Sequence, residues 1–395
     1  MTALGDDMRV LARGASALLA WLCVSVQVRG QALGVDRVLY MTREGMLFKS
    51  YHERFAAPAG LDLRAELLHV SRLSTFAASL HGQGARGLRR LFAQYPQAGW
   101  AELLASLGEA PATGPAPLAR TGLALAEAIA ADPARSAWLA GVAARRHGAL
   151  SAYLHAAHAD ALQAGHLLVV DIGWRGSIQD NLALALPELA WSGLYVGLHP
   201  FLSPQPANAW KQGLLFDAAD SRRLPGDNLM PIEYLFHQPI GTVSGYHDGQ
   251  AQTLPALAAE DAFAAAFQAA VLADAPERAE AWAGQPGVAT IAAWREEAQA
   301  FWSGCQRLPL PLFQALCRYA HEETFGLGQS VHLAEVMSPR AAMRGLLSRR
   351  DRELFVQYVG ALPLSLRHEP ALGLWLRGWL HLRQVLARLR SGARH

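Results

Sequence analysis

Residues 169–178, with the sequence VVDIGWRGSI, bring several groups capable of chemistry into one short stretch. An apolar strand runs into a glycine-containing loop, and a helix is predicted to begin near Ser177. Gly173 and Gly176 permit backbone conformations in which several N–H groups point at one anion. Ser177 can cap the helix and donate its hydroxyl to a phosphate, and the helix N-terminus adds the positive end of its dipole. The segment predicts an anion-binding loop, with a plain strand-to-helix turn as the alternative.

Two charged residues extend this hypothesis. Arg175 can make a bidentate contact to a phosphate, and Asp171 can hold a ribose hydroxyl or a magnesium ion. The alternative role for Asp171 is to accept hydrogen bonds from backbone amides of the turn. The loop lacks the Gly-Lys-Ser/Thr of a P-loop and the third glycine of a dinucleotide fingerprint. No Asp-x-Asp pair occurs in the chain, which argues against phosphatases and glycosyltransferases that require one.

Arg43 and Arg72 each follow a different predicted strand. If the strands are parallel, both arginines emerge at the carboxyl edge beside Arg175, where open α/β sheets bind ligands. Three guanidinium groups there would suit a polyanion such as a phosphosugar or nucleotide. Taken singly, an arginine in such a position is more often a surface or ion-paired residue than part of a site. Glu44 either orients Arg43 or acts as a general base.

The elements that must position these residues follow an α/β pattern. Short apolar strands alternate with helices, which predicts a parallel, Rossmann-like sheet. The predicted strands are residues 37–41, 66–70, 166–170 and 193–198, and a helix is predicted over 178–186.

The chain divides into three predicted parts. Residues 1–73 and 164–250 form the α/β core, and residues 74–163 form a large helical insertion that could cap the strand ends. Residues 251–395 form a helical C-terminal region, in which Asp261 caps a helix. Within the core, residues 213–216, 232–235 and 241–246 are predicted as further short strands.

Charge, cysteine content and hydrophobicity limit which partners and which compartment fit this chain. The net charge of +2 gives no reason to expect a nucleic-acid partner. Three cysteines without a C-x-x-C motif indicate neither a disulfide framework nor a zinc site and fit a reducing cytoplasm. The apolar run 15–28 is too short to span a membrane, and it is predicted to be a buried helix that leads through Gly34 into a strand. A signal peptide is the alternative.

The C-terminal segment is basic. Residues 372–389 have a helical pattern in which tryptophans and leucines alternate with arginines. Such a basic amphipathic helix can lie on an anionic membrane surface, which would place the protein at the periphery of the inner membrane. The alternative is a terminal helix whose apolar stripe packs on the core.

Four segments resemble a bacterial family commonly described as predicted hydrolases of the haloacid-dehalogenase (HAD) superfamily. They are residues 39–45 (LYMTREG), 69–72 (HVSR), 170–179 (VDIGWRGSIQ) and 232–235 (IEYL). The family often occurs in surface-polysaccharide loci beside glycosyltransferases. The resemblance implies a role in capsule or O-antigen biosynthesis, with a glycosyltransferase or a separate phosphatase-like chain as partner. The family more often has Arg-Asp-Gly where this chain has Arg43-Glu44-Gly45, and fuller members carry an N-terminal Asp-box domain before the point where this chain starts.

The same order of parts resembles a phosphoribosyltransferase-type core, in which residues 171–177 would match the phosphate loop. Those enzymes usually carry two adjacent acidic residues, whereas Ile172 follows Asp171 here. The sequence therefore predicts a protein that binds a phosphorylated sugar or nucleotide, with Mg²⁺ as the implied metal. Asp171 and Glu44 are its candidate catalytic groups, with Asp171 also the metal ligand, and the phosphate-binding residues are Arg43, Arg72, Gly173, Arg175, Gly176 and Ser177. The alternatives are a non-catalytic scaffold or sensor of the same pathway and a HAD-type phosphatase that uses Asp171 as nucleophile.

Overall fold

The computed structural model describes residues 5–217, 229–256 and 261–307, together with short pieces between residues 309 and 332. The chain forms two compact units. The first comprises Met1–Leu224, Leu235–Phe301 and Glu322–Ser330, and the second comprises Pro225–Tyr234, Trp302–His321 and Val331–His395. Of the second unit, the structure describes parts of the helices α9 (Met230–Phe236) and α11 (Val288–Arg307), and the antiparallel strands β8 (Ala320–His321) and β9 (Val331–His332).

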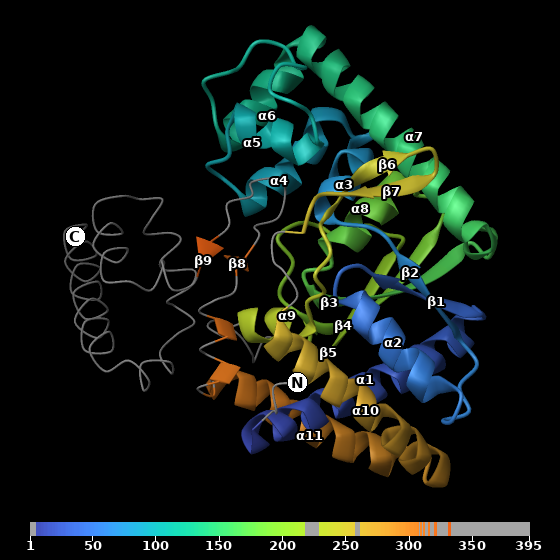
Figure 1. Ribbon diagram of the computed structural model, residues 1–395. Coiled ribbons are helices and arrows are strands. Elements are labelled where there is room, and N and C mark those ends of the chain that lie inside the picture. The colour runs from blue at the N-terminus through green and yellow to red at the C-terminus, as the bar shows by residue number, and fades with distance from the viewer. Residues whose placement is uncertain are drawn as a thin grey trace, which may run out of the picture. The chain divides into compact units, whose positions relative to one another are not determined.

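A five-stranded, entirely parallel sheet forms the centre of the first unit (Figure 1). Its strands are β1 (Arg37–Met41), β2 (Arg64–Leu68), β3 (His166–Trp174), β4 (Ala190–Leu198) and β5 (Ala209–Phe216), in the order β2-β1-β3-β4-β5. The predicted α/β fold class is confirmed. The order of the strands reverses between β1 and β3, and in open α/β sheets ligands bind at the carboxyl ends of the strands at such a point.

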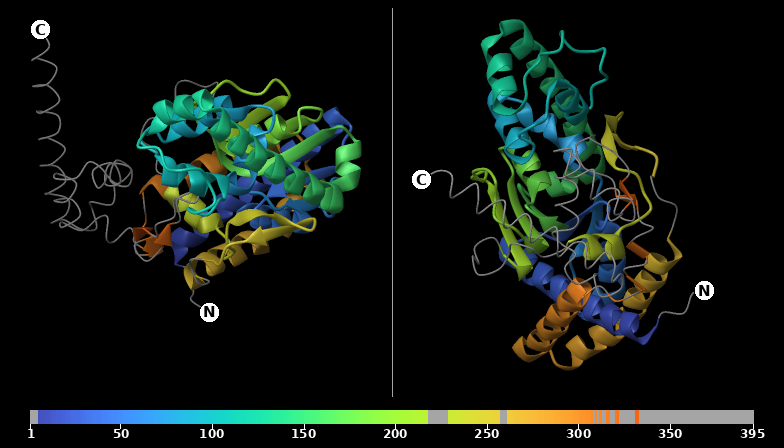
Figure 2. Two further views of the ribbon diagram at one scale, coloured as in Figure 1. Left: turned by 90° about the horizontal axis from the view of Figure 1, so that it is seen from above. Right: turned by 90° about the vertical axis from the view of Figure 1, so that its left-hand side faces the viewer.

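Helices cover both faces of the sheet. The helices α1 (Asp6–Leu33), α2 (Gly45–Ala56) and α10 (Ala262–Gly284) lie on one side, and α3 (Arg72–Phe76), α7 (Pro133–Gln163) and α8 (Ser177–Ala185) lie on the other (Figures 1 and 2). Alternation along β1 matches these two layers. Tyr40 faces the first layer, where its hydroxyl hydrogen-bonds His52 of α2 at 2.7 Å. Leu39 and Met41 join the apolar core with α7 and α8.

The chain between β2 and β3 consists of helices and turns. After α3 come the 3-10 helices η1 (Ala78–Leu80) and η2 (Gly84–Leu88), then α4 (Arg89–Gln94), α5 (Trp100–Leu107), α6 (Gly122–Ala131) and α7. These short helices gather beside the N-terminal part of α7 around an apolar core of their own (Figure 2). We call residues 72–163 the insertion.

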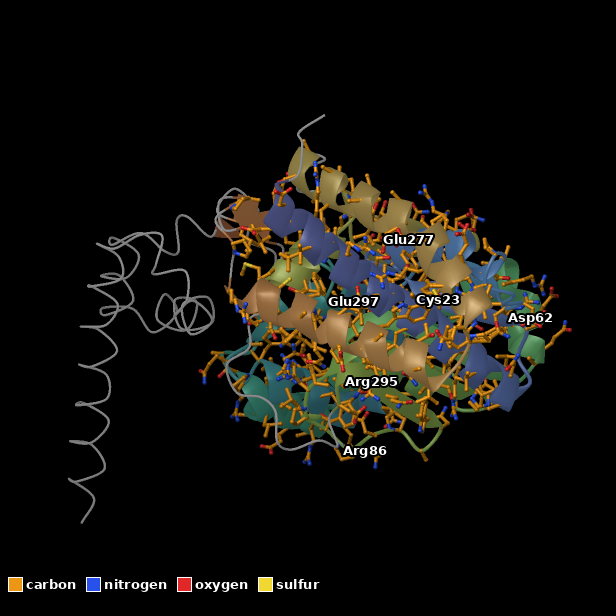
Figure 3. The ribbon with its side chains drawn as sticks, turned by 90° about the horizontal axis from the view of Figure 1, so that it is seen from below. Cys23, Asp62, Arg86, Glu277, Arg295 and Glu297 are labelled. Carbon is orange, nitrogen blue, oxygen red and sulfur yellow. The ribbon has the colours of Figure 1, made fainter. Side chains whose placement is uncertain are left out.

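The N-terminal helix α1 lies between α10 and α11 (Figure 3). The helix extends well beyond the run 15–28, so the expectation that the apolar segment is too short to span a membrane is wrong by length and composition, yet 83% of its apolar window is buried against protein. It ends at Gly34, which adopts a left-handed conformation and leads into β1 as the sequence predicts. The Arg278 guanidinium, 8% exposed, joins these helices by contacting Asp274 at 2.9 Å and Glu297 at 2.6 Å.

Three further segments were assigned from the sequence. Asp261 caps α10 by accepting a hydrogen bond from the Phe263 amide at 2.8 Å, as predicted. Residues 241–246 contribute to β6 (Val243–His247), which pairs with β7 (Gln250–Thr253) in an antiparallel hairpin. The predicted strand 232–235 is wrong, because these residues belong to the helix α9, and its buried Ile232, Leu235 and Phe236 follow helical spacing. The basic segment 372–389 lies outside the described residues.

Candidate functional site

The carboxyl end of β1 is joined to the end of β2 by backbone and side-chain hydrogen bonds. The Thr42 amide donates to the Leu68 carbonyl at 3.1 Å, and its hydroxyl donates to the Val70 carbonyl at 3.2 Å. Arg43 follows and is half-buried, and Glu44 is buried at the N-cap of α2. The strand ending thus fixes both residues at the carboxyl edge of the sheet.

Arg72 is the first residue of α3 and is half-buried. It follows a capping box, in which Ser71 and Ser74 each accept the other's backbone N–H, at 3.0 and 2.9 Å. The Ser71 hydroxyl also donates to the Val243 carbonyl of β6 at 2.6 Å. These bonds fix the start of α3, and with it the position of the Arg72 backbone.

Asp171 lies in β3, next to β1 in the sheet, and is 6% exposed. Its carboxylate accepts a hydrogen bond from the Ile172 amide at 2.8 Å. Burial and the nearby Glu44 carboxylate raise the pKa of Asp171 to about 8, while the Arg72 guanidinium opposes that shift. Glu44 and Arg72 therefore both lie close enough to Asp171 to act electrostatically on its carboxyl. A pKa raised in this way favours the neutral form of the Asp171 carboxyl near neutral pH.

The loop after β3 is shorter than predicted, because the strand continues to Trp174. Gly173 pairs with Gly197 in this extension and has a φ of +130°, and a Cβ atom there would lie 2.1 Å from the Gly197 carbonyl oxygen. Only glycine fits this approach of two strands. Gly176 is the N-cap of α8 and makes the left-handed turn, with a φ of +60°. The expectation that Ser177 caps the helix is wrong, because Ser177 is its first residue and Gly176 holds the cap position.

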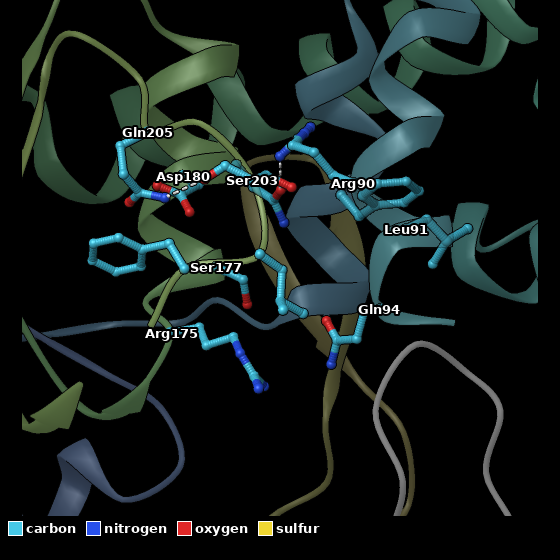
Figure 4. Close-up of a pocket in the computed structure, with 12 residues that line it drawn as sticks. Arg90, Leu91, Gln94, Arg175, Ser177, Asp180, Ser203 and Gln205 are labelled. Atoms are coloured by element: carbon cyan, nitrogen blue, oxygen red, sulfur yellow. Dashed lines mark hydrogen bonds between the residues drawn. The ribbon is translucent and has the colours of Figure 1, made fainter. Parts of the chain in front are cut away.

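A pocket opens at the start of α8 (Figure 4). It encloses about 500 Å³, including space open to solvent. Arg175 and Ser177 line one side, and Arg90, Leu91 and Gln94 of the insertion line the opposite side. The remaining lining residues come from the end of α3, from α8 and from the loop after β4, and they are Phe76, Asp180, Asn181, Phe201, Leu202, Ser203 and Gln205.

Five of the eight predicted site residues fall into two groups, while Gly173 and Gly176 shape the turn after β3 and Arg43 follows the end of β1. Arg175 and Ser177 line the pocket, whereas Asp171, Glu44 and Arg72 form the charged cluster at the ends of β1 and β3. Arg72 connects the two groups electrostatically. Desolvation and the Arg72 charge together lower the pKa of Arg175, and the Arg72 charge also acts on Asp171.

Sequence reasoning missed Arg90, which lines the pocket, and Lys211, which contacts the lining residues Asp180 and Gln205. Arg90 donates to the Asn181 amide oxygen and to the Ser79 hydroxyl, both at 2.7 Å. Lys211 of β5 forms an ion pair with Asp180 at 2.6 Å and donates to the Gln205 amide oxygen at 2.8 Å. Lys211 is one of two lysines in an arginine-rich chain, which is the one sequence signal that could have singled it out.

Gln179 fixes the direction of α8 against the sheet. Its buried amide nitrogen donates to the carbonyls of Trp191 and Trp210, at 3.0 and 2.9 Å. Its amide oxygen accepts the Tyr195 hydroxyl at 2.6 Å. These bonds hold the first turn of α8, and so the free N–H groups at its start, at the edge of β4 and β5.

The cluster offers two carboxylates to a metal. Within the described ranges, no group of three or more His, Cys, Asp or Glu side chains is arranged to hold one. Mg²⁺ commonly binds through one or two carboxylates together with substrate phosphate and water. Glu44 and Asp171 fit that donor set, and the phosphate of a bound ligand would have to complete it.

In comparisons with known proteins, the chain matches no protein-family model and no curated protein.

Proposed function

We propose that this protein binds a phosphorylated small molecule, a phosphosugar or a nucleotide, in the pocket at the start of α8. The observation that carries the proposal is the position of Arg175 and Ser177 in one pocket with the N-terminus of α8. The free N–H groups of the first helical turn, a hydroxyl and a guanidinium are the donors that phosphate-binding loops use.

The charge of the pocket supports an anionic ligand. Asp180 is its acidic lining residue and is already paired with Lys211 at 2.6 Å. The Arg175 guanidinium makes no hydrogen bond or ion pair with another described residue. A bound phosphate would therefore meet donors and positive charge without an opposing free carboxylate.

The neighbouring cluster supports turnover of that ligand by hydrolysis or group transfer. A protonated Asp171 beside Glu44 is suited to donate a proton to a leaving oxygen, because its pKa of about 8 keeps it neutral near pH 7. With Mg²⁺ bound, the same two carboxylates would act as metal ligands and the ion would neutralise phosphate charge. The Arg72 guanidinium, whose charge acts on both Asp171 and Arg175, would add to the positive potential that attracts the ligand's phosphate.

A non-catalytic sensor or scaffold is the second candidate. It is favoured by the backbone hydrogen bond from Ile172 to Asp171, which gives this carboxyl a structural role. On the sequence resemblance alone, we propose that either form serves bacterial surface-polysaccharide biosynthesis with a glycosyltransferase or phosphatase-like partner. A cytoplasmic location is proposed from the three cysteines without a C-x-x-C motif.

The test is a thermal-unfolding screen of the full chain with orthophosphate, sugar phosphates and nucleotides, each with and without Mg²⁺. A ligand at one hundred times its dissociation constant stabilises the native state by about 2.7 kcal/mol. We expect a rise in Tm that is lost in Arg175→Ala and reduced in Ser177→Ala. Arg86→Ala, which removes an exposed arginine outside the pocket, serves as the control. No rise in Tm with any of these ligands would refute the proposal, and turnover assays on the ligands that bind would separate enzyme from sensor.

A further inference from the structure

Arg90 brings a cation from the insertion to the side of the pocket opposite Arg175 (Figure 4). Its guanidinium donates to Asn181 of α8 and to Ser79, both at 2.7 Å, and its centre lies 5.9 Å from the centroid of the Phe76 ring. These partners fix the guanidinium in place. All three are uncharged.

The described part of the chain supplies no ion-pair partner for Arg90. Asp180 exerts a favourable charge on it from a distance, but the Asp180 carboxylate is occupied by Lys211. Burial lowers the pKa of Arg90 to about 10, because the guanidinium has lost hydration and the distant Asp180 charge offsets only part of that loss. A charge removed from water is normally compensated by an opposite charge, because leaving it unpaired is costly.

The pocket therefore contains two cations on different structural elements, Arg175 on the loop after β3 and Arg90 on α4. One phosphate held by Arg175 and the start of α8 leaves the Arg90 charge uncompensated. We propose that the ligand carries a second phosphoryl group and that Arg90 binds it. This inference rests on the proposed function and narrows it from phosphorylated compounds in general to those with two phosphoryl groups.

The insertion thereby acquires a role in ligand selection. Arg90 would distinguish a diphosphate or bisphosphate from a monophosphate, while Arg175 and Ser177 would bind the phosphate that both kinds of ligand share. A charge-assisted hydrogen bond contributes about 1.5–3 kcal/mol, which corresponds to roughly a tenfold to hundredfold difference in dissociation constant.

The test is calorimetric titration of the full chain with orthophosphate, pyrophosphate and fructose 1,6-bisphosphate in magnesium-free buffer. We expect the wild type to bind pyrophosphate or the bisphosphate at least tenfold more tightly than orthophosphate. Arg90→Met is expected to abolish that preference, because it should weaken pyrophosphate and the bisphosphate at least tenfold more than it weakens orthophosphate. Arg175→Ala is expected to weaken all three ligands, and Arg89→Ala, which removes the exposed neighbour on α4, to weaken none.

The outcomes separate this inference from the one on which it rests. Wild-type protein that binds orthophosphate and shows no preference for either doubly phosphorylated probe would overturn the role of Arg90 and keep the proposed function. An equal loss of affinity for all three probes in Arg90→Met would indicate that the substitution disturbs the structure of the pocket. Arg90→Lys then decides the matter: restored binding would show that the positive charge at this position matters, and continued loss of binding would overturn the role proposed for Arg90. Absence of binding by every probe would refute the proposed function and this inference together.

Discussion

The Lys211 ammonium lies 2.6 Å from the Asp180 carboxylate, and this ion pair connects the strand β5 to the first turn of α8. Both side chains are largely buried, with 3% of Lys211 and 15% of Asp180 exposed. Lys211 also donates to the Arg175 carbonyl at 3.2 Å. The pair thus holds the loop that carries Arg175 against the sheet.

Lys211→Met is expected to destabilise the protein by about 3–5 kcal/mol, because it leaves the Asp180 charge buried and unpaired. Adding Asp180→Asn should recover a large part of that loss, since the double variant holds no unpaired charge. Urea denaturation of the two single variants and the double variant gives the coupling energy. Additive effects of the two substitutions would show that the pair contributes nothing as a pair.

Asp171→Asn is expected to alter how stability depends on pH. The carboxyl ionises near pH 3.8 in an unfolded chain and at about 8 in the folded protein. Between these values the folded state holds a proton that the unfolded state lacks, so wild-type stability falls as pH rises, by at most about 1.4 kcal/mol per pH unit. The neutral amide has no such dependence. Urea denaturation at pH 5 to 9 should show the free energy of unfolding of the variant rising relative to that of the wild type up to about pH 8. A difference in unfolding free energy that does not change with pH would contradict the shifted pKa.

Gly173→Ala is expected to cost more than about 2 kcal/mol. Its φ of +130° disfavours any side chain, and the added methyl would meet the Gly197 carbonyl at 2.1 Å. Gly148→Ala is the matched control, because Gly148 is exposed within α7 and a Cβ there meets nothing within 4 Å. That control should be neutral or stabilising by about 0.5–1 kcal/mol. Similar Tm values for the two variants would rule out the close approach of β3 and β4.

Gln179→Leu is expected to destabilise the protein by about 3 kcal/mol, because it leaves two carbonyls and the Tyr195 hydroxyl without their partner. Tyr195→Phe removes only one of these bonds and should cost about 1 kcal/mol. If α8 owes its position to Gln179, the Leu variant should also lose phosphate affinity, while the Phe variant keeps it. Equal losses of stability in both variants would show that the hydrogen bonds from Gln179 to the two backbone carbonyls contribute no measurable stability.

The strand core could be predicted from the sequence because apolar runs bounded by glycine and polar residues specify parallel strands locally. The sequence predicts that the residues after those strands lie at one edge, and Glu44 and Arg72 do act electrostatically on the Asp171 carboxyl. The helix over 230–236 was missed because four residues, Ile-Glu-Tyr-Leu, fit a strand as well as a helix turn, and the deciding neighbour is Phe236.

The pocket itself could not be predicted in full. Arg90 and Ser177 are far apart in the sequence, and their approach depends on how the insertion folds around its own core. Lys211 and Asp180 likewise meet only after β5 has paired with β4 and α8 has packed on both. No local pattern records such contacts, because each residue alone is compatible with an exposed position.

The strands β2 and β3 lie on either side of β1, about 10 Å apart in the sheet at strand spacing, yet the whole insertion of residues 72–163 separates them along the chain. The segment leaves the sheet at the carboxyl end of β2 and re-enters it at the opposite edge, where β3 begins, and α7, which ends at Gln163, makes that crossing. The short helices between α3 and α7 gather around an apolar core of their own, so the sheet does not require their particular length or content. Because Arg90 belongs to these short helices and Glu44, Asp171 and Arg175 do not, exchange of the short helices is a route by which descendants of one scaffold could acquire new ligands while conserving those residues at the strand ends. Divergence among relatives of this protein should accordingly concentrate between β2 and β3.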